Sequence, residues 1–350
     1  MSIALVTGAP GWLGTRLVRA LAHGLPDVPE LAGSTGREIR VLTHGPSDPA
    51  ALETIGGNVR VFAGDVSSRS TLDGFMQGAA GATVFHAAGV IHPARRVRTF
   101  YDVNHRGTVN MLDAAARAGV RRFVHVSSNS PLGMHDHDEA PFDEASPYHP
   151  YMNYGRSKKL AEDAVNEAGR TGMLETVIIR PPWFYGPDQP ERQSRFIRMI
   201  RRGKVPLVGG GRSLRSMAYV DNICQGLLLC ERVNDASGRT YWIADAQPYT
   251  MNEIIETVER VLEEDFSLPV SHGRVRLPGA VSRIARLADA AIQGAGLYVP
   301  EIHVLSEMNR SIACRIERAR AELGYEPRIA LREGMRRSVQ WMLDHNVPLG

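Results

Sequence analysis

The amino-terminal stretch places a buried strand, a glycine-rich turn and an amphipathic helix in immediate succession. The apolar run that ends at residue 7 predicts a short strand, and one apolar helical face predicts a helix over 12–23. Gly8, Gly11 and Gly14 lie three apart across the turn. Such a turn lets backbone approach a ligand closely, and the helix N-terminus that follows favours an anionic group. An ordinary tight turn leaves the same pattern, so its interpretation depends on the rest of the chain.

Strand-like and helix-like segments alternate through the first half of the chain. Strands are predicted at residues 3–7, 39–43, 59–63, 83–86, 123–127 and 176–179. Helices are predicted between most of them, at residues 12–23, 69–77, 100–118 and 151–169. Apolar strands that are each followed by a helix predict a parallel sheet covered on both faces. The predicted fold class is α/β: a Rossmann-type doubly wound parallel sheet that binds its ligand at the carboxyl ends of the strands.

The pattern changes after residue 180, where four prolines interrupt any helix. Helices are predicted beyond them at residues 192–202, 222–231, 251–262, 280–293, 315–323 and 332–343. We therefore expect a dinucleotide-binding domain over 1–181 and a smaller α/β substrate lobe over 182–350, with the segment 215–250 returning to the first domain. Residues 24–36 are expected to form an exposed insertion.

Composition narrows the class of protein. The net charge is +3 with acidic and basic residues interspersed, which predicts no nucleic-acid partner. The richest basic stretch, residues 195–204, is interpreted as a solvated helix face, with an anionic substrate subsite as the alternative. Three cysteines without a CxxC pair favour a reducing compartment. No signal peptide is evident and no apolar stretch has the length of a membrane span, so we expect a cytoplasmic protein without a membrane partner.

A tyrosine and a lysine stand four residues apart at the start of the helix predicted at 151–169. Tyr154 and Lys158 therefore share one helix face. An ammonium group near a phenol favours phenolate, so Lys158 is expected to lower the pKa of Tyr154 toward the range of a general acid/base. A serine at the end of the preceding strand can hydrogen-bond the reacting oxygen. Together these groups predict proton transfer for an alcohol/ketone pair, with hydride exchange at a nicotinamide.

The order of these motifs resembles that of the extended short-chain dehydrogenases/reductases, in the branch of NAD-dependent epimerases/dehydratases and 3β-hydroxysteroid dehydrogenases. The resemblance covers nearly the whole chain. The segments that carry it are TGAPGWLG at 7–14, GDV at 64–66, HAA at 86–88, VNHRGT at 103–108, YGRSK at 154–158, RPPWFYGP at 180–187 and LGYEP at 323–327. Together these motifs are specific indicators of the fold and the cofactor class, but weak indicators of the substrate.

The resemblance implies a role for each matching residue. Tyr154 is the acid/base, Lys158 lowers its pKa and holds the nicotinamide ribose, and Asn104 supports the active-site helix. Ser128 orients the carbonyl, with Ser130 as the alternative. The implied cofactor contacts are Gly8, Gly11, Trp12, Leu13, Gly14, His44, Asp65, Val66, Ala87, Ala88, Ser127, Tyr154, Lys158, Pro181 and Phe184.

The choice between NAD and NADP depends on the end of the second predicted strand. A site that prefers NAD usually places an acidic residue there to bind the ribose 2′-hydroxyl. Thr43 and His44 stand at that place instead. A 2′-phosphate is therefore tolerated, and His44 or Arg37 can meet it, so the cofactor is predicted as NAD(P), with NADP slightly favoured.

The candidate substrate residues favour two different classes of substrate. Trp183 stands where sugar-nucleotide relatives carry an asparagine, and with the apolar stretch 274–296 it favours an apolar ketone. Arg215 matches an arginine that meets phosphate in those relatives. Ser128, Ser130, Trp183 and Arg215 are the candidate substrate contacts. The predicted function is interconversion of a secondary alcohol and a ketone by an NAD(P)-dependent oxidoreductase. A nucleotide-sugar 4-epimerase or dehydratase with tightly bound NAD is the first alternative, and a non-catalytic dinucleotide sensor the second.

Two further expectations concern a loop and the assembly. The segment 133–146 contains His135, Asp136, His137 and Asp138, which are interpreted as part of a polar lid loop, and no metal is expected. His92 and Trp12 are interpreted as packing or cleft-wall residues without an assigned role. By analogy with the family, a homodimer is expected through the helix that carries Tyr154 and the helix before it.

Overall fold

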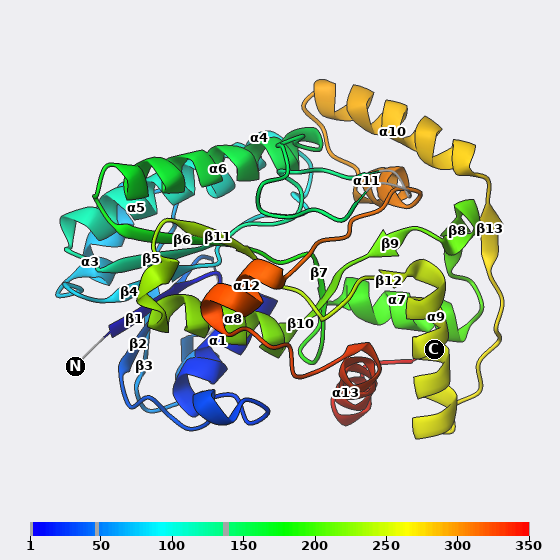
Figure 1. Ribbon diagram of the computed structural model, residues 1–350, viewed down its shortest axis with the longest axis horizontal. Helices are drawn as coiled ribbons and strands as arrows, with labels where there is room; N and C mark the ends of the chain where they lie inside the picture. Colours follow the sequence, from blue (N-terminus) through cyan, green and yellow to red (C-terminus); the bar gives the residue numbers. More distant parts are fainter. Residues whose placement is uncertain (1–2, 46–48, 136–139, 350) are drawn as a thin grey trace.

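Seven parallel strands form the central sheet of the computed structural model, which describes residues 3–45, 49–135 and 140–349 (Figure 1). The strand order is β11-β6-β5-β4-β1-β2-β3. The strands are β1 (Ile3–Thr7), β2 (Glu38–Thr43), β3 (Val59–Ala63), β4 (Thr83–His86), β5 (Arg122–Val126), β6 (Glu175–Arg180) and β11 (Arg239–Trp242). The predicted Rossmann-type sheet is confirmed. The edge strand β11, which pairs in parallel with β6 and lies within 215–250, was not predicted.

Helices cover both faces of this sheet, as the apolar strands require. On one face lie α3 (Leu72–Met76), α5 (Thr108–Arg117) and α6 (Met152–Arg170), whose apolar side chains share a core with Leu5 and Val84. On the other lie α1 (Trp12–His23), α8 (Val220–Arg232) and α12 (Glu317–Leu323). Figure 1 shows α5 and α6 on one side of the strands and α1 and α8 on the other.

The second lobe is built around α7 (Glu191–Arg201), α9 (Met251–Arg260) and α13 (Leu331–Asp344), whose apolar faces share a third core. Three two-stranded pairs lie outside the central sheet. They are β7 (Trp183–Tyr185) with β10 (Met217–Tyr219), β9 (Leu214–Arg215) with β12 (Tyr249–Thr250), and β8 (Pro206–Val208) with β13 (Val275–Leu277). The first of these pairs carries the predicted substrate residue Trp183.

Two helices outside this lobe form a unit that we term the cap. They are α10 (Gly279–Gly294) and α11 (Pro300–Glu307), which pack against each other at the periphery of the molecule (Figure 1). The cap reaches the start of α6, where the Gln293 side chain accepts a hydrogen bond from the backbone N–H of Asn153 at 3.1 Å. The helix α11 was not predicted.

The structure departs from the predicted elements in the first half at three places. The short helix α2 (Pro49–Glu53) was missed. The insertion at 24–36 is only partly exposed, because Leu25, Val28 and Leu31 pack into the core beneath α1. The helix predicted at 100–118 comprises the short α4 (Arg98–Phe100), a π-helical turn over Tyr101–Gly107 and α5. None of the described helices has the length and apolar character needed to cross a membrane.

Candidate active site

The glycine-rich turn forms a cradle that leaves no room for side chains. A Cβ added to Gly8 would lie 2.6 Å from the backbone of Ala87, and one added to Gly11 would lie 2.5 Å from the Gly8 oxygen. At Gly14 an added Cβ would again come within 2.5 Å of backbone atoms. Gly8 also has a φ of 95°, which side-chain-bearing residues rarely adopt. The backbone can therefore approach a pyrophosphate at the N-terminus of α1, so this cradle fits a dinucleotide.

The position of the cradle in the sheet supports the same ligand. The strand order reverses between β1 and β4, and a dinucleotide binds in the crevice that such a reversal creates. Gly8 follows β1, and Ala87 and Ala88 follow β4, so the predicted contacts converge at this crevice. Ala88 N–H donates to the Thr7 hydroxyl at 3.1 Å, which holds the two strand ends together.

His86 extends this connection across the sheet. Its Nδ1 lies 2.9 Å from Thr7 Oγ1 and its Nε2 lies 3.0 Å from Thr108 Oγ1. Thr108 itself donates to the backbone oxygen of Asn104 at 2.7 Å. Since Thr7 accepts from Ala88, its proton points to Nδ1, and His86 donates from Nε2 to Thr108. Burial lowers the pKa of His86 to about 3, which keeps the ring neutral.

Tyr154 lies in the first turn of α6 with its ring 5.7 Å from that of Phe100. Burial raises the pKa of Tyr154 to about 12, and a hydrogen bond with Ser128 acts in the opposite direction. The expected lowering of the Tyr154 pKa by Lys158 is therefore wrong. Desolvation of the phenolate outweighs the stabilising groups, and the proton stays on the phenol at neutral pH.

Lys158 follows one helical turn after Tyr154 and is buried. Its Nζ donates to the backbone oxygen of Val126 at 2.7 Å and lies 3.4 Å from His125 Nε2. Burial lowers the pKa of Lys158 to about 8, with Glu162 acting to raise it. The ammonium group is thus fixed beneath the end of β5.

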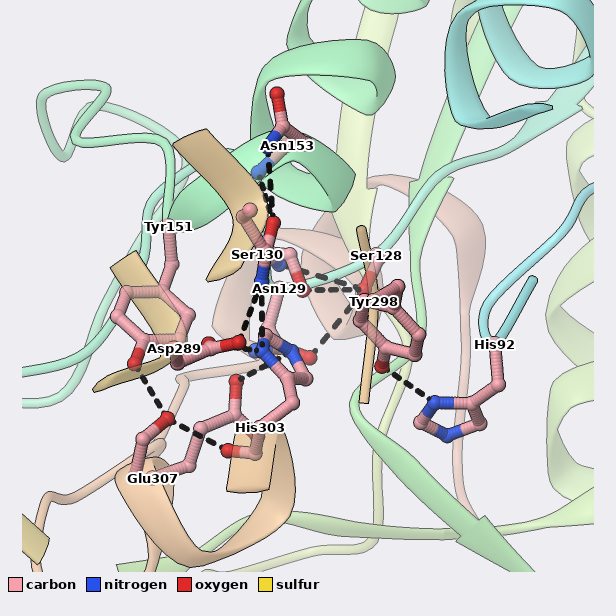
Figure 2. A network of polar contacts seen from close by, with 12 residues as sticks. His92, Ser128, Asn129, Ser130, Tyr151, Asn153, Asp289, Tyr298, His303 and Glu307 are labelled. Carbon is pink, nitrogen blue, oxygen red and sulfur yellow. Dashed lines mark hydrogen bonds and ion pairs between the residues drawn. The ribbon is translucent and has the colours of Figure 1, made fainter. Parts of the chain in front are cut away.

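Ser128 and Ser130 lie in the loop after β5, on the same side as Tyr154. Ser128 Oγ accepts a hydrogen bond from the backbone N–H of Ser130 at 3.3 Å, and the two hydroxyl oxygens are 3.4 Å apart. Both residues are buried. Figure 2 shows the two serines side by side. Ser128 is the serine whose hydrogen bond acts to lower the pKa of Tyr154, which favours Ser128 over Ser130 as the partner of the phenol.

Asn104 joins the active-site helix to the loop after β4. Its Oδ1 accepts from Val90 N–H at 2.7 Å, while its Nδ2 donates to the Val90 oxygen and to Ser157 Oγ, both at 3.0 Å. The π-helical turn carries Asn104 to this buried position. Its contacts are with protein groups, so it acts as a positioning residue for α6.

Ser127, predicted as a cofactor contact, points into a buried ion-pair network instead. Its hydroxyl donates to Glu162 Oε1 at 2.5 Å. Glu162 also pairs with Arg180 at 2.6 Å and accepts from the Tyr148 hydroxyl at 2.7 Å. Glu162 lies four residues after Lys158, so the sequence spacing alone could have placed Glu162 on the same helix face.

His44 and Asp65 come together at the ends of β2 and β3. His44 Nδ1 lies 3.5 Å from Asp65 Oδ2, and the His44 side chain is 77% exposed. The suggestion that Arg37 meets a 2′-phosphate is wrong. Arg37 precedes β2, at the opposite end of that strand from His44, and both terminal nitrogens bind Glu231 at 2.6 and 2.7 Å.

The remaining predicted cofactor contacts are hydrophobic. Val66 lies against Gly107 and its backbone oxygen accepts from Asn110 at 3.0 Å. Leu13 and Pro181 are buried, and the Leu13 side chain belongs to the core under the sheet. From Leu13, therefore, only the backbone is placed to meet a ligand at the helix N-terminus.

Aromatic side chains line the segment between the sheet and the second lobe. The rings of Trp12 and Phe184 are 5.1 Å apart, and those of Trp183 and Phe196 are 5.3 Å apart. Trp12 Nε1 donates to the Pro187 oxygen at 2.6 Å, which fixes its indole against the start of the lobe. Trp12 thus packs between Phe184 and the start of the lobe.

Arg215 is buried at the edge of the cap. Its Nη2 donates to the backbone oxygen of Glu307 at 2.8 Å, while its buried Nη1 has no hydrogen-bond partner among the described residues. Burial lowers the pKa of Arg215, and nearby Glu307 acts to raise it.

The structure adds a polar cluster that the sequence reasoning missed. His92 Nδ1 lies 2.6 Å from the Tyr298 hydroxyl (Figure 2). Arg192 contacts the other ring nitrogen of His92. Arg192 is close enough to Tyr154 to act on its pKa. These residues come from segments about a hundred positions apart, so no local pattern could have grouped them.

Inside the cap, His303 Nδ1 lies 2.7 Å from Asp289 Oδ2, and Gln293 donates to the other Asp289 oxygen at 2.9 Å (Figure 2). Tyr151 and Ser306 join their hydroxyls at 2.5 Å. These bonds fasten the cap to the first turn of α6, next to Tyr154.

The polar loop at 133–146 is described only in part. His135 accepts a hydrogen bond at Nε2 from the backbone N–H of Ala313 at 3.2 Å and packs edge-on against Phe142. Its place is structural. Asp136, His137 and Asp138 lie outside the described residues.

Comparison with known proteins gives consistent matches along the chain. Residues 4–244 match the model of the NAD dependent epimerase/dehydratase family. An uncharacterized protein, y4nL, from Sinorhizobium fredii is 48% identical over 340 residues, covering 97% of this chain and 94% of the relative. The 4-hydroxy-2-methyl-3-oxo-4-farnesyl-3,4-dihydroquinoline-1-oxide ketoreductase of Stigmatella aurantiaca is 28% identical, covering 94% and 93%. The structure of DesIV, a dTDP-glucose 4,6-dehydratase from Streptomyces venezuelae with NAD bound, covers 98% of both chains at 25% identity and a TM-score of 0.74.

Proposed function

The chain belongs to the NAD-dependent epimerase/dehydratase family of extended short-chain dehydrogenases/reductases, and within it we propose an NAD(P)-dependent oxidoreductase that interconverts a secondary alcohol and a ketone. The observation that supports the proposal most is the bond of Lys158, one helical turn after Tyr154 on α6, to the oxygen of Val126, at the end of the strand that leads into Ser128. A hydroxyl pair beside a fixed cation is the arrangement that proton transfer to a carbonyl oxygen requires.

The proton is held by Tyr154. When bound, a nicotinamide dinucleotide supplies or accepts the hydride. With a pKa raised to about 12, the phenol of Tyr154 keeps its proton at neutral pH and can give it to a carbonyl oxygen. The Ser128 hydroxyl donates to that same oxygen and orients it. Carbonyl reduction is therefore the direction that the resting protonation state supports.

Lys158 and Asn104 keep this arrangement in place. The ammonium group of Lys158 is anchored on the Val126 oxygen and has further protons to donate to a ribose hydroxyl. Asn104 fixes α6 through Ser157 and the loop after β4 through Val90. Lys158 would position the cofactor, and Asn104 positions the helix that carries Tyr154.

The cradle at Gly8, Gly11 and Gly14 would hold the pyrophosphate, and the Lys158 side the nicotinamide ribose. His44, exposed at the end of β2, would meet the adenosine ribose. Because no carboxylate follows β2 directly, we propose that NADP is slightly preferred over NAD.

The substrate proposed for this site is a ketone without a nucleotide. Trp12 packs against Phe184, and Trp183 packs against Phe196, which gives aromatic surface suited to an apolar or ring-shaped molecule. A relative at 28% identity is named as a ketoreductase. That relative supports the reaction class and leaves the individual ketone open.

A nucleotide-sugar epimerase or dehydratase is the second candidate, favoured by one observation. Arg215 is buried, and its Nη1 has no partner among the described residues. A phosphate oxygen would satisfy this nitrogen and compensate the buried charge. The intact Tyr154 and Lys158 pair makes a non-catalytic dinucleotide sensor a weaker interpretation than either enzyme.

Whether the purified protein retains bound cofactor distinguishes the two enzyme reactions. The protein is purified, denatured, and any released nucleotide is identified by mass spectrometry. One equivalent of NAD supports the epimerase, which regenerates its cofactor in each cycle. An empty protein that binds added NADPH or NADH reversibly supports the oxidoreductase. Affinity for neither nucleotide contradicts both.

We also propose that the protein is a cytoplasmic homodimer, assembled through α5 and α6. Leu160 is 37% exposed on α6 and would lie in such a contact. Light scattering on the wild type and on Leu160→Asp tests the assembly. A monomeric mass for the wild type would refute it.

A further inference from the structure

The helix α10 buries a polar stripe and exposes an apolar one. Its buried positions are Ser282, Ala285, Asp289 and Gln293, of which three are polar. Helices on the surface of a globular protein normally turn their apolar stripe inward. Here the inward stripe is the polar one, and its side chains bind the rest of the cap and the start of α6.

The outward face of α10 is apolar. Ile284 is 67% exposed and Leu287 is 72% exposed, and the alanines at 280 and 291 continue the same stripe. Since these positions follow the helical repeat, they lie on one face, opposite the buried one. Elsewhere in the cap region, Leu297, which follows α10, and Val304 on α11 are also exposed, at 52% and 42%. Single exposed leucines are common, but a continuous stripe on the outermost helix indicates a contact.

The exposed charges on this helix have one sign. Arg283 and Arg286 are exposed, whereas the only other charged residue of α10, Asp289, is buried against His303. Arg283 lies one turn before Leu287, so its side chain borders the apolar stripe. A surface that complements α10 must therefore accept apolar side chains and carry negative charge.

A second copy of this chain complements the face poorly. A two-fold dimer through α10 would bring Arg283 and Arg286 of both copies into one interface, where α10 exposes no carboxylate to pair with them. The face is also a convex ridge, with α11 on its inner side and no element outside it (Figure 1). A fluid surface can receive such a ridge without a matching groove.

We propose that α10 docks on an anionic lipid surface, lying in the plane of the interface with Ile284 and Leu287 among the acyl chains and Arg283 and Arg286 at the headgroups. This is the arrangement of interfacial amphipathic helices. It needs no membrane-spanning segment, but it departs from the expectation of a protein without a membrane partner. The inference is independent of the proposed reaction, because it depends only on the outer face of the cap.

The consequence concerns the position of the active site. The inner face of the docked helix is bonded to the first turn of α6 through Gln293 and Asn153, next to Tyr154. Docking would therefore hold the start of α6, which carries Tyr154, one helix away from the lipid surface.

Sedimentation of the full chain with vesicles tests this proposal. Vesicles of phosphatidylcholine alone are compared with an equal mixture of phosphatidylcholine and phosphatidylglycerol. We expect sedimentation with the anionic vesicles only, decreasing at high salt. Leu287→Glu should weaken binding by about tenfold or more, because it removes an inserted side chain and adds a repelled charge.

Controls keep the outcome decisive. Met173→Glu changes another exposed apolar side chain, 49% exposed beyond the far end of α6, and should sediment like the wild type. Arg283→Glu should weaken binding with no change in the thermal melting of the protein. Wild-type protein that stays in the supernatant with both vesicles overturns the proposal. So does Leu287→Glu binding as the wild type does, or a dimer that Leu287→Glu dissociates in the absence of lipid.

Discussion

The Nζ atom of Lys158 donates a hydrogen bond to the backbone oxygen of Val126 across 2.7 Å. This bond ties α6 to the end of β5, the strand that leads into Ser128. It also fixes the ammonium group in a buried place, where burial lowers the pKa of Lys158 to about 8. Near neutral pH the site therefore holds a protonated lysine beside a protonated tyrosine.

The first prediction concerns the pH dependence of ketone reduction. Lys158 loses its charge as the pH rises past about 8, whereas Tyr154 keeps its proton up to a pKa of about 12. We expect kcat/KM to fall above about pH 8 with the loss of one proton. Lys158→Arg, which remains charged, should be less active but lack this inflection. A profile that stays level to pH 10 for the wild type would contradict the assignment.

The second prediction concerns Glu162. Its carboxylate is fully buried and receives hydrogen bonds from Ser127, Tyr148 and Arg180. Glu162→Gln removes the partner of a buried cation and sets an amide group against donors. We expect a loss of about 3–5 kcal/mol in the free energy of unfolding. Chemical denaturation measures it, with Glu167→Gln as the matched control.

Glu167 lies on the same helix and pairs with Arg170, but both side chains are largely exposed. Its replacement should leave stability nearly unchanged, because solvent screens such pairs. Equal effects of the two substitutions would show that the Glu162 network is not a buried support of the site.

The third prediction concerns cofactor choice. His44→Asp places a carboxylate at the end of β2, where it can accept a hydrogen bond from a ribose 2′-hydroxyl and repel a 2′-phosphate. We expect affinity for NADH to rise about tenfold while affinity for NADPH falls. Fluorescence titration with both nucleotides measures the change. An unchanged ratio would place the adenosine ribose elsewhere.

The fourth prediction concerns the cap. Burial alone would lower the pKa of His303, but its hydrogen bond with Asp289 and the nearby Glu307 carboxylate raise the pKa overall. A raised folded-state pKa gives stability that is present below the unfolded value near 6.5 and lost as pH rises through the folded value. Hydrogen exchange in α10 and α11 should therefore quicken, beyond the intrinsic rate, between pH 6 and pH 9. Asp289→Asn should abolish this dependence, and a wild-type cap with constant protection would refute it.

Much of the fold follows from local patterns. The strand 3–7, the helix 12–23 and the glycines between them are visible because apolar periodicity and missing side chains act over short distances. The four-residue spacing of Tyr154 and Lys158 fixes them on one face of α6 in the same way. The strand β11 escaped prediction because its four residues contain arginine and threonine and lie at the sheet edge.

The parts that could not be predicted depend on partners far apart in the sequence. From the sequence alone, Arg37 could be assigned to a phosphate. The fold pairs its side chain with Glu231, which is distant in the sequence. Asp289 and His303 form their hydrogen-bonded pair only because α10 and α11 pack together. The direction of the Tyr154 pKa shift reversed for the same reason, since burial is a property of the assembled structure.

The measurement that tests the central claim most directly is the activity and cofactor affinity of Tyr154→Phe. This change removes the phenol oxygen and its proton while keeping the ring against Phe100. We predict that kcat falls by about 10²–10⁴-fold while the Kd for NADPH or NADH stays within about twofold of the wild-type value. Tyr241→Phe, whose hydroxyl binds Glu322 away from the site, should retain full activity. Turnover by Tyr154→Phe at the wild-type rate would contradict the proposed function.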